Sequence, residues 1–192
     1  MRRRLIVLLG AVSGAHFNPA VTLATWFTGR RDPDGLALRD VAAYVPAQIA
    51  GAIGGAVLAD AMFAKPLVKF SAHDRSAGHL GEVVATAGLI LLIFSLSRIG
   101  RAVLAPAAVA SHIGAAYWFT SSTSFANPAV TIGRTFTDTF AGIAPASVAP
   151  FIAAQLLGAA LGLGAVALIY GRPAPVPDEA AVPHGGPEPA IS

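Results

Sequence analysis

The chain has 192 residues, of which 55% are hydrophobic and 12% are charged, and its net charge is +3. Ordinary globular domains carry about 25% charged residues, so this composition argues against a soluble enzyme and against a disordered chain. The basic residues are scattered between apolar blocks, which argues against a nucleic-acid-binding face. There is no cysteine, and the five histidines show no i, i+4 pairing, so we expect neither a metal site nor a bound cofactor.

Apolar blocks and polar loops alternate along the chain. Half a span covers residues 5–16, a short stretch follows at 18–28, and a second short stretch lies at 127–137. Four further blocks come close to or exceed the roughly 20 apolar residues that a helix needs to cross a bilayer. These expected spans are 41–63, 80–97, 103–120 and 147–170. The pattern predicts an all-α, multi-pass membrane domain at 1–171, followed by a proline-rich, disordered tail at 172–192.

An internal repeat defines the architecture. The pentapeptide Asn-Pro-Ala-Val-Thr that begins at Asn18 recurs, 109 residues later, at Asn127. Three expected spans separate the two copies, and an odd number of crossings puts them on opposite sides of the membrane. The sequence therefore predicts an inverted repeat, which is the design of channels and transporters with a site at the membrane midplane. The candidate pore residues are Asn18, Pro19 and Ala20 in the first copy and Asn127, Pro128 and Ala129 in the second.

Each motif opens a stretch of about ten residues, which is long enough for half of the bilayer. Asparagine is a strong N-cap, and proline fits the first helical turn because its missing N–H has no intrahelical partner there. The motifs therefore predict two re-entrant half-helices whose N-termini meet near the middle of the membrane. The positive ends of two helix dipoles would repel cations, and the Asn18 and Asn127 amides would donate hydrogen bonds to a neutral molecule.

The residues around the first motif, Ser-Gly-Ala-His-Phe-Asn-Pro-Ala-Val-Thr at 13–22, and the second Asn-Pro-Ala closely resemble the major intrinsic proteins, the aquaporins and glycerol channels. Gln48, Gln155 and the pair Glu82 and Thr86 match as well. The resemblance implies six spanning helices plus two half-helices, a pore in each subunit, and a homotetramer in the lipid of the cell membrane. It also implies a first span, and the outer part of a second, that the chain does not contain. We therefore expect an N-terminally truncated chain.

The resemblance assigns three residues to the constriction of the pore. Family members usually carry arginine directly after the second motif, and the residue at this position here is Val130. Two other constriction positions fall at Ala115 and Ser124, so the resemblance implies a wide and weakly polar filter. Arg134 lies one turn after Val130 on the same helical face and is a candidate to replace part of the missing charge. Some bacterial members linked to arsenic resistance look similar at this position.

Two ionisable residues have alternative interpretations. Glu82 is an intramembrane carboxylate, a type of residue that often relays protons, whereas the resemblance implies a structural acceptor for the backbone N–H groups of a half-helix. For His16 we expect a structural role in holding the loop before Asn18, with pore lining as the alternative.

Basic residues indicate which way the chain crosses the membrane. The loops expected inside hold Arg30, Arg31, Arg39, Arg98, Arg101 and Arg172, and those expected outside hold Lys65, Lys69, Arg75 and Arg134. This weak bias agrees with the preference of basic residues for the cytoplasmic side. We therefore call the end that carries Arg75 the outer end.

The function predicted from these features is a passive channel for water and small uncharged solutes such as glycerol, with arsenite as a further candidate. No nucleophile and base are arranged for catalysis, so we do not expect an enzyme. An ion-coupled secondary transporter is the alternative, because inverted repeats and broken helices serve both classes, although no acidic pair lies near the midplane. A non-conducting fragment of a channel is the third possibility.

Overall fold

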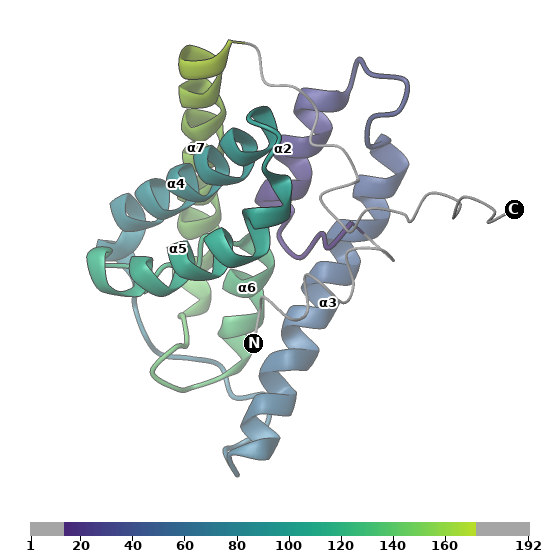
Figure 1. Ribbon diagram of the computed structural model, residues 1–192. Coiled ribbons are helices and arrows are strands. Elements are labelled where there is room, and N and C mark those ends of the chain that lie inside the picture. Colours follow the sequence, from purple (N-terminus) through teal and green to yellow (C-terminus); the bar gives the residue numbers. More distant parts are fainter. Residues whose placement is uncertain (1–13, 172–192) are drawn as a thin grey trace, which may run out of the picture.

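The computed structural model describes residues 14–171 of the chain. Most of the expected half-span at 5–16, and the whole of the expected tail at 172–192, lie outside the described residues. The described residues form helices and loops without a strand (Figure 1). Four of the described helices are long and apolar enough to cross a membrane. The predicted all-α membrane fold is therefore confirmed.

The helices follow the predicted order with small shifts at their ends. They are α2 (Pro19–Gly29), α3 (Leu38–Met62), α4 (His79–Arg98), α5 (Ala105–Phe119), α6 (Pro128–Gly133) and α7 (Pro145–Tyr170). Short 3-10 turns are η1 (Ser76–Gly78), η2 (Ala102–Leu104) and η3 (Arg134–Phe136). Helix α3 begins inside the expected charged loop, because the Asp40 carboxylate accepts a hydrogen bond from the backbone N–H of Ala37 at 3.2 Å and favours the positive end of the helix.

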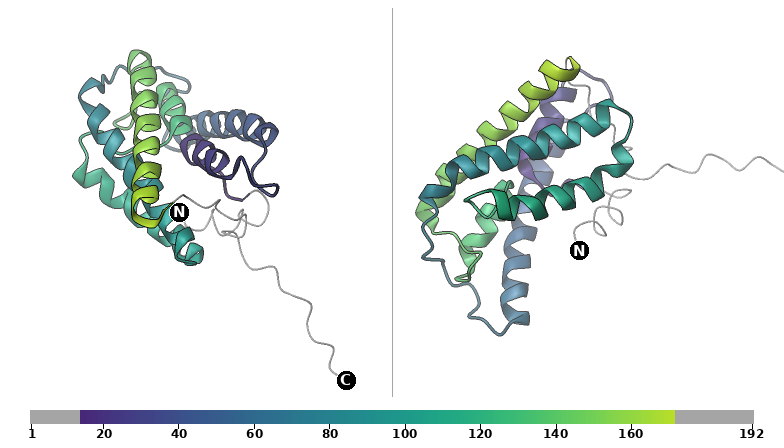
Figure 2. Two further views of the ribbon diagram at one scale, coloured as in Figure 1. Left: turned by 90° about the horizontal axis from the view of Figure 1, so that it is seen from above. Right: turned by 60° about the vertical axis from the view of Figure 1, so that its left-hand side comes forward.

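Helices α7, α4 and α5 lie one beside the next, as the right-hand view of Figure 2 shows. Helix α7 crosses α4 closely, because two glycines of α7 face the backbone of α4. A Cβ atom at Gly162 would lie 2.7 Å from the carbonyl oxygen of Ala87, and a Cβ atom at Gly158 would meet that of Val83. Small residues of this kind let membrane helices approach closely.

The two short helices are held inside the bundle by apolar packing. Helix α2 packs against α3 and α7, and α6 packs against α3 and α7 as well. One core cluster joins Ala24 of α2 to Phe94 of α4 and Val166 of α7. The spanning helices therefore fix the position of the first motif, which opens α2.

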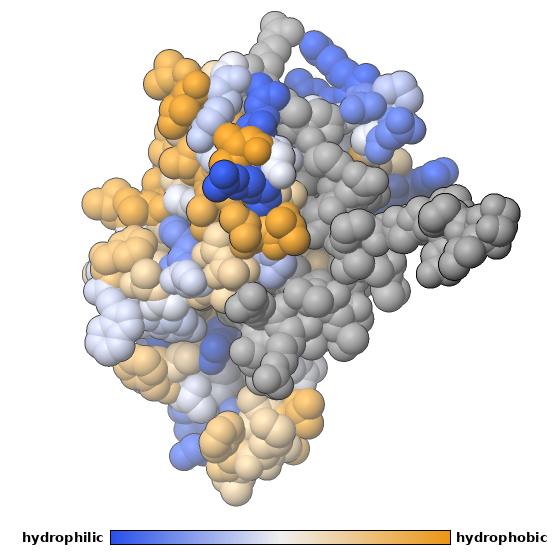
Figure 3. Space-filling model, viewed as in Figure 1, coloured by the Kyte–Doolittle hydropathy of each residue, from blue (hydrophilic) through white to orange (hydrophobic). Residues whose placement is uncertain are grey.

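Much of the described surface is apolar (Figure 3). Large hydrophobic side chains stand exposed on the outside of the bundle, including Trp118, Leu168 and Phe140. Hydrophilic residues gather at the upper right of this view, over the loop between α2 and α3. An apolar flank with a polar loop at one end agrees with a chain that lies in lipid.

The close crossing of α4 and α7 predicts that alanine at two nearby glycines of α7 has different effects on the unfolding temperature. We expect Gly162→Ala to lower the unfolding temperature in detergent, because its Cβ would push against Ala87 and overpacking costs about 1–3 kcal/mol. Gly164→Ala is the matched control, because nothing lies within 4 Å of its Cβ direction among the described atoms. Equal unfolding temperatures for the two variants would contradict this account of the crossing.

Candidate functional site

The N-termini of α2 and α6 are capped by the asparagines of the two motifs. The Asn18 side-chain oxygen accepts a hydrogen bond from the backbone N–H of Ala20 at 2.9 Å. The Asn127 side-chain oxygen accepts from Ala129 at 3.0 Å and from Val130 at 3.3 Å. A proline opens each helix. The predicted N-caps are therefore present in both copies.

The same two asparagines also join the half-helices to each other. The Asn18 amide nitrogen donates to the carbonyl oxygen of Ala126 at 2.7 Å, and the Asn127 amide nitrogen donates to that of Phe17 at 2.9 Å. Each asparagine thus bonds to the residue that precedes the other. The two opposed N-termini meet inside the bundle, as the repeat predicts.

A glutamine and a threonine support each motif in the same way. Gln48 of α3 donates to the Thr22 hydroxyl at 2.9 Å, and Gln155 of α7 donates to the Thr131 hydroxyl at 2.8 Å. Each threonine in turn donates to the carbonyl oxygen of its own motif asparagine at 3.0 Å. The two copies of the sequence repeat therefore make the same set of hydrogen bonds.

Glu82 of α4 holds the loop that leads into α6. Its carboxylate is fully buried and accepts hydrogen bonds from the backbone N–H groups of Phe125 and Ala126, both at 2.8 Å. The side chain of Gln155 donates to the same carboxylate at 2.6 Å. These contacts support the interpretation of Glu82 as a structural acceptor. They give no support to the interpretation of Glu82 as a proton relay.

His16 lies in the loop before Asn18, against α2 and α3. Its Nδ1 atom is 3.1 Å from the Thr22 hydroxyl, its carbonyl oxygen accepts from Gln48 at 2.9 Å, and its ring stacks on Tyr44 with centroids 5.0 Å apart. These contacts support the proposed role of His16 in holding this loop.

The Glu82 contacts fix the direction of two carbonyl groups. In a trans peptide the N–H and the C=O point in opposite directions. Because the N–H groups of Phe125 and Ala126 point to Glu82, the carbonyl oxygens of Ser124 and Phe125 point away from α4. No described residue outside the regular helices donates a backbone hydrogen bond to them. They are therefore acceptors on the side of the loop opposite to Glu82.

The structure places the three predicted constriction residues in different environments. Ser124 is buried, and its hydroxyl has no hydrogen-bond partner among the described residues. Val130 is half-buried in the first turn of α6, beside the cluster of Phe125, Ile143 and Phe151. Ala115 is exposed on α5. A constriction made by these three residues stays a prediction.

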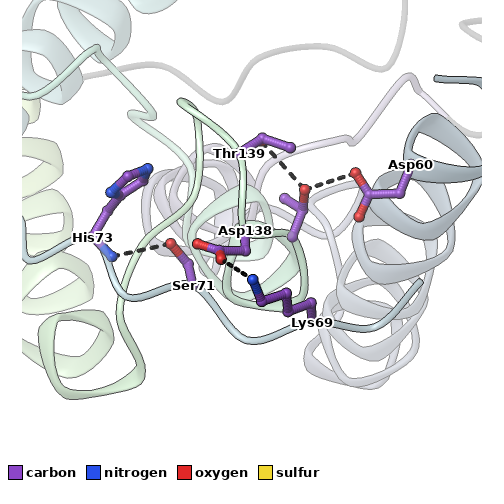
Figure 4. A network of polar contacts seen from close by, with 7 residues as sticks. Asp60, Lys69, Ser71, His73, Asp138 and Thr139 are labelled. Carbon is purple, nitrogen blue, oxygen red and sulfur yellow. Dashed lines mark hydrogen bonds and ion pairs between the residues drawn. The ribbon is translucent and has the colours of Figure 1, made fainter. Parts of the chain in front are cut away.

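A network of polar contacts ties the outer loops together (Figure 4). The Thr137 hydroxyl donates to the buried Asp60 carboxylate at 2.8 Å, which joins the end of α3 to the loop after η3. Lys69 forms an ion pair with Asp138 at 2.7 Å, and this hydrogen bond from Lys69 holds the pKa of Asp138 below its usual value. These contacts therefore join the end of α3 and the loop after it to the loop after η3.

Two neighbouring residues before η1, Asp74 and Arg75, have pKa values below their usual ones. The backbone N–H of Ser76, followed by the hydroxyls of Ser147 and Ser76, holds the pKa of Asp74 below its usual value. Burial lowers the pKa of Arg75, and the positive charge of Arg134 lowers it further. The backbone geometry relates the two arginines, since Arg75 bonds to Gly142 and the next residue, Ile143, donates its N–H to the carbonyl oxygen of Arg134 at 3.3 Å.

A groove of about 770 Å³ lies between α2 and α7. Its walls are mostly small or apolar residues such as Leu23, Ala160 and Leu163, and Arg30 and Arg31 stand at its border. Ala20 borders the groove, but neither motif asparagine lines it. The groove is therefore separate from the meeting point of the two half-helices.

Comparisons with known proteins agree with this geometry. The family model described as Major intrinsic protein matches residues 3–124 of the chain, which is more than half of it. The chain belongs to the major intrinsic protein family. Its multi-pass helices accordingly place it in the cell membrane.

Among the relatives, "Aquaglyceroporin AqpS" of Rhizobium meliloti (strain 1021) is 49% identical over 161 residues, which are 83% of this chain and 66% of that protein. A "Glycerol uptake facilitator protein" of Pseudomonas aeruginosa is 31% identical, over 88% of this chain and 74% of the relative. A "Propanediol uptake facilitator PduF" of Citrobacter freundii is 36% identical over 42% of this chain and 30% of its own length. The chain thus spans just under two thirds of AqpS.

Sequence reasoning missed several residues of this site. The roles of Thr22 and Thr131 were not predicted, although both stand in the repeated pentapeptide and the repeat itself was a signal. The sequence places Arg75 only in an expected outer loop and indicates no role for Asp60. Neither belongs to a motif, so no sequence pattern indicated their contacts.

Replacing Glu82 tests the support of the second half-helix. We expect Glu82→Gln to lower the unfolding temperature in detergent, because the amide would turn a donor toward the N–H of Phe125 or Ala126. A buried donor without an acceptor costs about 1–3 kcal/mol. Asp34→Asn is the control, since Asp34 is exposed and its side chain makes no described hydrogen bond or ion pair. Wild-type stability of Glu82→Gln with loss of proton movement would instead favour a proton relay.

Proposed function

We propose that this chain is the subunit of a passive channel for water and small uncharged solutes, with glycerol as the representative solute. The observation that carries the proposal is the reciprocal bonding of Asn18 and Asn127 where the two half-helices meet. Family membership supports it, and the names of the relatives, an aquaglyceroporin and a glycerol uptake facilitator, describe proteins of this kind.

The polar groups at the meeting point suit a neutral, hydrogen-bonding solute. An asparagine amide carries two N–H donors, and the bonds to Ala126 and Phe17 use one donor of each motif asparagine. The second donors, with the carbonyl oxygens of Ser124 and Phe125 as acceptors, would replace the hydrogen bonds that a solute makes in water. The positive ends of α2 and α6 would disfavour cations at the same point.

The proposal extends to the residues and assembly that the family resemblance implies. Asn18, Pro19, Ala20, Asn127, Pro128 and Ala129 would form the narrow centre, with Ala115, Ser124 and Val130 at the outer constriction. The buried, unpartnered hydroxyl of Ser124 supports its place beside the solute path. We also propose a homotetramer surrounded by lipid, with small neutral solutes as the only ligands.

Flux measurements test whether the protein is a channel. We expect the full-length gene product, reconstituted in liposomes, to accelerate glycerol and water movement down their gradients, with no response to an imposed sodium or proton gradient. Protein-free liposomes are the control. Uptake that follows an ion gradient would favour the secondary transporter, and flux no faster than in the control would favour the non-conducting fragment.

Replacing Val130 tests the outer constriction. We expect Val130→Arg to reduce glycerol and arsenite uptake several-fold more than water flux, because the longer side chain narrows the path and adds charge and donors there. Val130→Leu, which adds volume without charge, separates the effect of size from that of charge. If Val130→Arg leaves water, glycerol and arsenite fluxes all unchanged, Val130 does not line the constriction.

A further inference from the structure

Arg75 is anchored against the loop that leads into the second half-helix. Its guanidinium donates to the carbonyl oxygens of Gly142 at 2.6 Å and Phe140 at 2.8 Å. It also donates to the Thr123 hydroxyl at 3.1 Å and lies 5.1 Å from the ring centroid of Phe125. Thr123 and Phe125 flank Ser124, so the charge of Arg75 is held beside the predicted constriction.

No described carboxylate neutralises this charge by an ion pair. The two ion pairs among residues 14–171 involve other cations, Arg39 and Lys69. The Asp74 carboxylate turns instead to the backbone N–H of Ser76 and the hydroxyl of Ser147. The Glu82 carboxylate is already bonded to three donors. The guanidinium of Arg75 therefore has no ion-pair partner among the described residues, and the more distant charge of Glu82 acts on it only by raising its pKa.

A second cation stands close to the first. Arg134 follows the last residue of α6, one turn after Val130, and is half-buried. Within the described part of the chain its side chain has no hydrogen bond or ion pair, while its charge acts on Arg75 strongly enough to lower the pKa of Arg75. The carbonyl oxygen of Arg134 accepts from the backbone N–H of Ile143 at 3.3 Å, and Arg75 bonds to the preceding residue, Gly142. The two arginines thus lie by the same loop at the outer end, and Arg134 has unused donors.

We infer that Arg75 and Arg134 together supply the positive charge that excludes cations at the outer mouth of the pore. Val130 supplies no charge in the first turn of α6, and the neighbouring carbonyl oxygens of Ser124 and Phe125 would attract cations. Two guanidinium groups at the entrance raise the local potential and oppose this attraction. The inference rests on the proposed channel function and assigns its charge selectivity to these two residues.

The experiment compares cation leak with solute flux in liposomes that contain the full-length gene product. Arg134→Gln removes a charge whose side chain holds no described contact, so its folding should be unaffected. Arg75→Gln removes the other charge together with the loop contacts, and Arg75→Lys keeps the charge. Arg98→Gln is the control, because Arg98 lies at the opposite end of α4, where it is half-buried and donates to the carbonyl oxygen of Tyr170.

We expect Arg134→Gln and Arg75→Gln each to raise the ratio of potassium to glycerol flux, and the double variant to raise it about tenfold. Arg75→Lys and Arg98→Gln should keep the wild-type ratio. The difference between Arg134→Gln and wild type should shrink in high salt, because salt screens a charge but not a packing contact.

Two results would overturn the inference, and they are distinguishable from failure of the channel proposal. An unchanged ratio in Arg134→Gln and the double variant, with glycerol flux intact, contradicts the inference alone. A leak in Arg75→Lys equal to that in Arg75→Gln, with Arg134→Gln at the wild-type ratio, shows that Arg75 acts only by holding the loops. A wild-type protein that passes no uncharged solute contradicts the channel proposal itself.

Discussion

Two helix N-termini are buried in the middle of an apolar bundle, and every free N–H group there needs a partner inside the protein. The two motif asparagines meet this requirement with their side-chain oxygens, which cap their own helices. Their amide nitrogens also donate to the carbonyl oxygen that precedes the other helix. Glu82 meets the same requirement for the loop before α6. Side chains of three spanning helices, α3, α4 and α7, are therefore committed to holding two short segments in place.

The helices beside the two copies of this hydrogen-bond pattern are not equally close-packed among the described residues. Gly158 and Gly162 of α7 lie against the backbone of α4, whereas Gly51 and Gly55, which stand 107 residues earlier on α3, have no described atom within 4 Å of their Cβ directions. The contacts between Gln48 and Thr22 form nonetheless. Among the described residues, the glutamine–threonine contact is therefore present in both copies, and the close glycine crossing only in the second.

The sequence was most informative where a local rule determines the structure. Asparagine before proline predicts an N-cap without reference to the rest of the chain, and both caps are present. The odd number of spans predicts opposed half-helices, and they meet. Arg75 illustrates the limit, because its partners lie 48 to 67 residues away in two loops. Only the fold brings such residues together, and no local pattern encodes their contacts.

The geometry of the peptide bond links the support of the second half-helix to its selectivity. Directing the N–H groups of Phe125 and Ala126 toward Glu82 turns the preceding carbonyl oxygens away from α4, toward the proposed path. Carbonyl oxygens accept hydrogen bonds from water and polyols, but their partial negative charge also attracts cations. A path built in this way needs positive charge nearby. With valine at position 130, the helix N-termini supply part of that charge. The inferred role of Arg75 and Arg134 is to add the rest from outside the first turn of α6.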